Sequence, residues 1–130
     1  MNEQEKEHLN ALSHEIIGAA LEVHKHMGPG LLEAVYEDCL MYELEQRGLK
    51  VARQVQRPII YKGNPVGHPL IIDILVEDCV ILELKAVSQL SETNVAQLLS
   101  YLKLSGLYLG LLINFNTAHL KDGIRRVVNG

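Results

Sequence analysis

Apolar and polar residues follow each other with two different periods along this chain, and the longer period predicts two helices at its start. From residue 13 to residue 27, apolar residues recur every three or four positions, as on one face of a helix. The residues of this face are Ile16, Ile17, Ala20, Leu21 and His24, with Val23 beside them. Ser13 is a suitable N-cap and Gly28 a suitable end. Residues 1–12 are polar, and we expect a frayed N-terminal segment there.

A second helix is predicted from residue 31 to residue 47, between the turn Gly28-Pro29-Gly30 and Gly48. Its apolar side consists of Leu32, Val35, Tyr36, Cys39, Leu40 and Leu44. Glu33 lies in the first turn, where a carboxylate offsets the positive end of the helix dipole. The helix pattern by itself therefore gives Glu33 a structural role.

The remaining pattern predicts strands around one further helix. The strands are expected at residues 49–61, with a bend at Pro58, and at 70–76, 80–86, 107–115 and 124–128. The helix begins at Ser91 or Thr93 and ends at Gly106; its core stripe is Val95, Leu98, Leu99 and Leu102, and Gln97 and Tyr101 share another face. Three successive strands predict an antiparallel meander, and a strand after the helix can return parallel to one of them. We expect an α/β (α+β) fold with a mixed β-sheet flanked by helices.

The segment from Leu70 to Ala86 differs from the rest because it is almost continuously apolar yet contains three charged residues. Its two strands should be covered on both faces. Asp73, Glu83 and Lys85 interrupt the apolar pattern. An ionised group in such surroundings costs roughly several kcal/mol unless it is paired or binds a metal ion. These three side chains are therefore the first candidates for a functional site.

The register of the two strands decides whether these side chains meet. A two-residue turn at Glu77-Asp78 would place Asp73 and Glu83 on opposite faces. A three-residue connection, or a bulge, would instead pair Val76 with Val80 and Asp73 with Glu83. We predict the second register, in which the two β-carbons lie about 5 Å apart. Carboxylates at that distance repel unless a cation lies between them, and their oxygens suit Mg²⁺ or Mn²⁺.

Composition limits the class of protein without identifying it. The chain has 130 residues, enough for one domain, which we assign to residues 13–130. No apolar run is long enough to cross a membrane, and the N-terminus does not resemble a signal peptide. We interpret Cys39 and Cys79 as small buried thiols and the six histidines as structural or surface residues. These features indicate a cytoplasmic protein.

Charge is unevenly distributed along the sequence. The net charge is −4, which argues mildly against a nucleic-acid partner. Residues 1–48 carry three basic and ten acidic side chains, whereas residues 49–130 carry nine basic and six acidic ones. The basic part is compatible with a nucleic-acid surface, but composition alone favours the simpler explanation, which is solvated surface charge.

The order of the elements and several short motifs together resemble the PD-(D/E)xK nuclease superfamily. Its restriction-endonuclease-like core runs helix, three strands, helix, strand (αβββαβ), and here an extra helix precedes it. Asp73 and Glu83-Leu84-Lys85 match its acidic and Glu-x-Lys positions, although Ile72 stands where the motif name has proline. Within the superfamily, Gly30-Leu31-Leu32-Glu33-Ala34-Val35-Tyr36 resembles the signature of the small bacterial and archaeal GxxExxY group. Further matching segments are Tyr61-Lys62-Gly63, Val76-Glu77-Asp78, Gln97-Leu98-Leu99-Ser100-Tyr101-Leu102 and Gly110-Leu111-Leu112-Ile113-Asn114-Phe115.

The resemblance implies a role for each candidate. Asp73, Glu83 and the backbone carbonyl of Leu84 would bind a divalent metal ion, Mg²⁺ or Mn²⁺, and Glu33 would bind the metal or its water. Lys85 would position or deprotonate the attacking water and stabilise charge that forms on the phosphate. Gln97, on the next helix, would correspond to an accessory polar residue of several such enzymes.

The sequence thus leads to one main hypothesis and two alternatives. The main hypothesis is a metal-dependent nuclease that hydrolyses phosphodiester bonds in DNA or RNA. A non-catalytic module that binds nucleic acid or protein would keep the same fold. In the third interpretation, Lys85 merely neutralises Asp73 and Glu83 as a buried structural cluster. The small size of the chain makes a homodimer or a protein partner plausible.

Overall fold

A computed structural model describes all 130 residues as one mixed α/β fold, as the sequence predicts. The helices are α1 (Glu3–Met27), α2 (Glu33–Gln46) and α3 (Glu92–Ser105), and a short 3₁₀ turn, η1, spans Leu120–Gly123. The strands are β1 (Val51–Tyr61), β2 (Asn64–Val76), β3 (Val80–Lys85), β4 (Leu109–Asn114) and β5 (Ile124–Val128).

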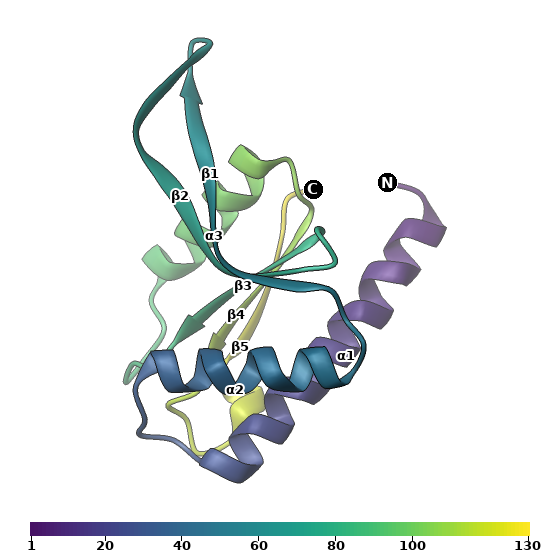
Figure 1. The fold of residues 1–130 in the computed structure, drawn as a ribbon, viewed down its shortest axis with the longest axis vertical. Helices are drawn as coiled ribbons and strands as arrows, with labels where there is room; N and C mark the ends of the chain where they lie inside the picture. The colour runs from purple at the N-terminus through teal and green to yellow at the C-terminus, as the bar shows by residue number, and fades with distance from the viewer.

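The five strands form one sheet in the order of the sequence, β1-β2-β3-β4-β5. All neighbouring pairs are antiparallel except β3 and β4, which are parallel. Parallel neighbours need a crossover connection, and α3 provides it, as the sequence pattern predicts. Figure 1 shows this mixed sheet with helices on both sides.

Two clusters of buried apolar side chains hold the helices to the sheet. The larger cluster joins α1 and α2 to one face through side chains such as Ile16, Leu40 and Leu82. The smaller cluster joins α3 to the opposite face, with Leu98 and Leu102 packed against Leu112. The central strands are therefore covered on both sides, which explains why β3 and β4 are almost continuously apolar.

Helix α1 begins ten residues earlier than Ser13, so the prediction of a frayed start and a Ser13 cap is wrong. Asn2 is the N-cap, and its side-chain oxygen accepts a hydrogen bond of 2.8 Å from the Glu5 amide. Ser13 is buried inside the helix. Leu9 and Leu12 extend the apolar stripe toward the N-terminus and are buried, so the polar residues between them simply face solvent.

Helix α2 also differs from the prediction at its first residues. Leu32 has extended backbone angles at the N-cap and is 76% exposed, rather than part of the buried side. The helical period does not apply to a residue that precedes the helix, and Met41 is buried in its place. Tyr36 is fully buried and stacks on Phe115, with ring centroids 4.6 Å apart.

The register of the central hairpin is the one that the sequence predicts. Val76 pairs with Val80, so three residues connect β2 to β3. Glu77 and Asp78 both adopt left-handed backbone angles in this connection, with φ of 52° and 55°. Among the two capping residues proposed for α3, Ser91 is the N-cap, and it forms a capping box with Asn94.

The outer half of the β1–β2 hairpin extends beyond the helices. Figure 1 shows it as a long two-stranded projection at the top of the molecule. We call residues 57–70 the β-arm. Residues 60–69 are all exposed, whereas the inner half of β2 has buried side chains from Leu70 onward, although Ile71 is still exposed. The arm begins three residues before Asp73, so it adjoins the candidate site.

Candidate metal centre where strands β2 and β3 separate

Strands β2 and β3 part at the position of the candidate carboxylates. Their pairing ends at Ile74 and Leu82, one residue before Asp73 and Glu83 would face each other. Beyond that point the Leu84 amide donates a hydrogen bond of 2.8 Å to Oδ2 of Asp73 instead of to the β2 backbone. The Asp73 amide in turn donates to Oε1 of Glu83 at 3.4 Å. Side chains thus replace the backbone ladder at this place.

The backbone of Leu84 faces the same gap as Asp73. The Lys85 carbonyl accepts a hydrogen bond from the Phe115 amide on the β4 side. Because backbone groups of successive strand residues point to opposite edges, the Leu84 amide and carbonyl point toward β2. The Leu84 carbonyl is therefore directed to the side on which Asp73 lies.

Glu83 is the most strongly perturbed acid of the protein. It is only 7% exposed, and its pKa is raised to about 8. Burial is the largest cause and the negative charge of Asp73 adds to it, whereas the hydrogen bond from the Asp73 amide and the charge of Lys85 oppose it. The two carboxyl groups thus lie close together, and the positive charge of Lys85 offsets their repulsion only in part.

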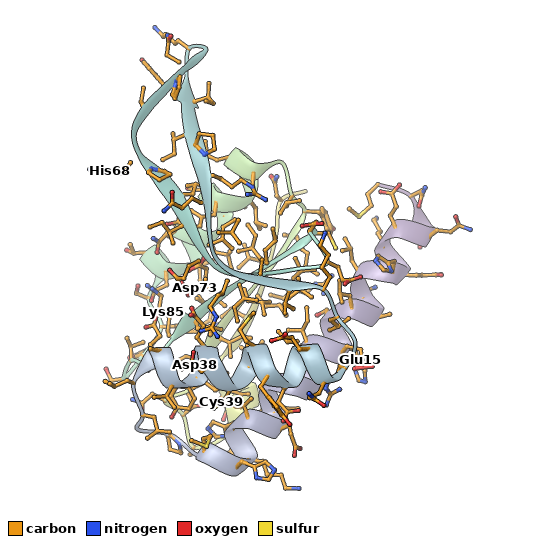
Figure 2. The ribbon with its side chains drawn as sticks, viewed as in Figure 1. Glu15, Asp38, Cys39, His68, Asp73 and Lys85 are labelled. Carbon is orange, nitrogen blue, oxygen red and sulfur yellow. The ribbon has the colours of Figure 1, made fainter.

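Lys85 lies two residues after Glu83 on β3 and is half-buried. Figure 2 shows Asp73 and Lys85 in the same region, next to helix α2. None of the five ion pairs in the structure includes Lys85. The interpretation as a buried structural cluster requires such a pair, so this geometry counts against it.

Glu33 belongs to another element, since it is the first residue of α2, and it lies near these groups. Its pKa is raised by partial burial and by the charges of Asp73 and Glu37, and Lys85 lowers it. Tyr36 fixes the preceding loop, since its hydroxyl donates to the Gly28 carbonyl (2.5 Å) and accepts from the Leu31 amide (3.1 Å). The tyrosine thereby holds the start of α2.

Gln97 makes no hydrogen bond with the carboxylates. It is exposed on α3 and donates a hydrogen bond of 3.3 Å to the Tyr101 hydroxyl. This agrees with the predicted shared face of the two residues but leaves a functional role of Gln97 as a prediction.

Gln54 is a residue of this region that the sequence analysis missed. It stands opposite Asp73 on β1, where the pairing of β1 with β2 skips one position, and its φ is +51°. Left-handed angles are uncommon outside glycine and often occur near functional sites. The Gln54 side chain donates a 2.7 Å hydrogen bond to Glu37 on α2. No sequence signal marks this position, because the strand pattern continues through it.

The donor set fits a hard divalent cation, although the side chains are not gathered around one point. Asp73, Glu83 and the Leu84 carbonyl offer oxygen ligands, the type that Mg²⁺ and Mn²⁺ prefer. A cation would also remove the repulsion that raises the pKa of Glu83. No group of three or more Asp, Glu, His or Cys side chains is close enough to bind a metal as it stands. Oδ2 of Asp73 accepts the Leu84 amide, and Oδ1 is its oxygen without such a hydrogen bond.

A family model of the PD-(D/E)XK nuclease superfamily matches residues 10–127. The chain belongs to the PD-(D/E)XK nuclease superfamily. Members of this superfamily typically use divalent metal ions and act on nucleic acids. Searches of curated proteins and of solved structures gave no match. No helix of this superfamily member is long and apolar enough to cross a membrane.

Proposed function

We propose that this protein is a divalent-metal-dependent nuclease that hydrolyses phosphodiester bonds in DNA or RNA. The observation that carries the proposal is the pair of adjacent carboxyl groups of Asp73 and Glu83, placed where β2 and β3 separate. A buried acid with a raised pKa beside a second acid is a typical feature of a functional site. A chain of this superfamily that keeps Asp73 and Glu83-Leu84-Lys85 keeps the groups that the reaction needs.

Asp73, Glu83 and the Leu84 carbonyl are the proposed metal ligands, with Glu33 as a further ligand of the metal or its water. A bound Mg²⁺ or Mn²⁺ would supply positive charge that stabilises the pentacoordinate phosphorus of the transition state. It would also lower the pKa of an attacking water. Glu83 has to lose its proton to act as a ligand, so the site should bind metal more tightly as the pH rises toward 8.

Lys85 is proposed to act on the phosphate. Its ammonium group is not engaged in an ion pair, so it is free to stabilise negative charge as it forms on the phosphate oxygens. Glu33, held by the loop that Tyr36 fixes, would orient the attacking water. Gln97 is proposed as an accessory polar residue that reaches the site only with substrate bound.

The alternative function is a non-catalytic module that binds nucleic acid or protein. One observation favours it: Asp73 accepts the Leu84 amide, and no ready cluster of three acidic side chains exists. A module of this kind would use the fold as a scaffold and its basic strands as the interface.

The finer family assignment rests on the motif at the start of α2. We assign the chain to the GxxExxY group on the basis of Gly30, Glu33 and Tyr36. Its two cysteines are free thiols, which suits the cytoplasm, where we place the protein. A second copy of the chain or a protein partner would supply further binding surface.

A cleavage assay with matched variants tests the proposal. Wild type, Asp73→Asn and Lys85→Met are incubated with mixed single- and double-stranded DNA and RNA, in Mn²⁺, in Mg²⁺ and in EDTA. Asp78→Asn is the control, since Asp78 is an exposed acid whose side chain pairs with Lys50 far from the site. We expect metal-dependent cleavage by wild type and control, and a loss of at least about a hundredfold in the two site variants. Metal binding without cleavage of any substrate would favour the alternative.

A further inference from the structure

The β-arm is the most exposed element of the protein and differs from the rest in charge. From residue 51 to residue 72 the sequence contains no aspartate or glutamate, although the whole chain has a net charge of −4. The lysine and arginine residues of this segment are Arg53, Arg57 and Lys62, of which the last two lie in the β-arm. Arg53 is neutralised by Glu37 and Asp38 of α2. Arg57 and Lys62 take part in no ion pair and lie in the exposed part of the hairpin.

The shape of the arm suits a narrow recess in its binding partner. It is a two-stranded ribbon, about 5 Å between the strands and about 10 Å across with side chains. Three prolines, Pro58, Pro65 and Pro69, stiffen it around a small hollow that they help to line. At its tip, Tyr61 is 61% exposed and Lys62 lies over its ring, 5.5 Å from the centroid. Figure 2 shows His68 on the same projecting part.

We propose that the β-arm binds the major groove of duplex DNA and places the neighbouring phosphates at the Asp73–Glu83 site; this rests on the proposed nuclease function. The major groove of B-form DNA is about 12 Å wide and admits a two-stranded ribbon. Asp73 lies nine positions after Asn64, the residue at the tip. At about 3.3 Å per residue, the distance along β2 is roughly 30 Å. That reach is close to one turn of the double helix, about 34 Å.

The chemistry of the arm separates duplex DNA from other nucleic acids. Single-stranded DNA and RNA are usually held by several aromatic side chains on which bases stack, and the arm has only one benzene-type ring, Tyr61, and one imidazole, His68. The major groove of double-stranded RNA is too deep and narrow for such a ribbon. Free cations on a stiff ribbon without acidic residues instead suit two phosphate chains that border an open groove.

A second copy of this chain is the other candidate for the exposed surface, because Ile60, Val66 and Ile71 are also exposed. Pairing between copies would need a free strand edge. β1 is an edge strand, but Pro58 and the cations on it oppose the addition of another strand. Pro65 and Pro69 block the other edge of the arm in the same way. Charge and backbone therefore favour a polyanion over a second copy.

The test compares two double variants with the same change of charge. Arg57→Gln/Lys62→Gln alters the arm, and Lys103→Gln/Lys121→Gln alters exposed lysines elsewhere. Binding to a labelled B-form duplex of about 24 base pairs, roughly two helical turns, is measured by fluorescence anisotropy in EDTA over a range of salt concentrations. Loss of two phosphate contacts should weaken binding roughly tenfold or more at about 0.1 M salt and lower the salt slope by about 2. The control pair should keep the slope of the wild type.

Three results would overturn the inference: equal losses in both double variants, no duplex binding by wild type, or binding of double-stranded RNA as tight as that of the DNA duplex. A change of oligomeric state in the arm variant alone, seen by sedimentation velocity with DNA binding intact, would assign the arm to a second copy. Because EDTA prevents metal-dependent cleavage, the binding result does not depend on catalysis. If the arm is required for binding but Mn²⁺ produces no cleavage, the nuclease proposal and the placing of phosphates at the Asp73–Glu83 site fail, and only the binding of duplex DNA by the arm stands.

Discussion

Replacing Glu83 by glutamine should remove a large pH dependence from the stability of the metal-free protein. Burial and the charge of Asp73 raise the pKa of Glu83 from 4.5 to about 8 in the folded state. The folded protein therefore holds the Glu83 proton more tightly than the unfolded chain does. The stability that this provides is fully present below about pH 4.5 and is lost as the pH rises to about 8.

The size of the effect follows from the two pKa values. Between them, the folded state binds one more proton than the unfolded state, so stability falls by about 1.4 kcal/mol per pH unit. Over the gap of about 3.5 units the total is on the order of 5 kcal/mol, comparable with the whole stability of a small domain. Glutamine stays neutral and has no such dependence. The advantage of Glu83→Gln over wild type should thus grow steadily from pH 5 to pH 8.

Urea unfolding, followed by circular dichroism in EDTA at pH 5, 6, 7 and 8, measures this difference. Glu45→Gln is the matched control, because Glu45 is exposed on α2 and makes no ion pair. The control should follow the wild-type curve at every pH. If the difference in the free energy of unfolding between Glu83→Gln and wild type stays constant over this range, the pKa of Glu83 is not raised. Such a result would mean that Glu83 is already ionised in the folded protein at pH 5.

Three other substitutions test hydrogen bonds and packing elsewhere in the fold. Tyr36→Phe keeps the stacked ring but leaves the Gly28 carbonyl and the Leu31 amide without their partner, and should cost about 1–3 kcal/mol in urea unfolding. Gly110→Ala should lower the free energy of unfolding by about 1–3 kcal/mol in the same assay, because the new β-carbon would lie 2.8 Å from Cδ1 of Leu98. Unchanged stability would contradict the close packing of α3 against β4. Gly18→Ala replaces a glycine inside α1 and should stabilise this helix by about 0.5–1 kcal/mol, which raises the melting temperature. Only the flexible side chain of Arg47 lies near the new methyl group. A lower melting temperature would show that Arg47 cannot move.

The sequence predicts the elements well wherever side chains are buried on a regular period. The continuous apolar runs of β3 and β4 predict covered strands, and the structure has them in a mixed sheet. The register of β2 and β3 is predictable because the three-residue connection brings Asp73 and Glu83 to one place. The sequence is compatible with a two-residue turn as well, and the structure shows that the three-residue connection is the one that forms.

Features that depend on solvent or on tertiary contacts are less visible in the sequence. The start of α1 at Glu3 is not marked by apolar residues, because the first two turns lie mostly in water. Leu32 continues the apolar period but is excluded from the helix by its extended backbone. The left-handed conformation of Gln54 occurs inside a strand whose register does not change there, and no residue type in the sequence predicts it. The projection of the β-arm likewise depends on where the helices end.

Titration calorimetry with Mn²⁺ tests most directly whether the Asp73–Glu83 pair is a metal centre. We expect wild type and Asp78→Asn to bind one or two ions with the same affinity, and Asp73→Asn to bind none. The affinity of the wild type should rise between pH 6 and pH 8 as Glu83 gives up its proton. Absence of binding by the wild type at millimolar Mn²⁺ at pH 8, or equal binding by Asp73→Asn, would contradict this expectation.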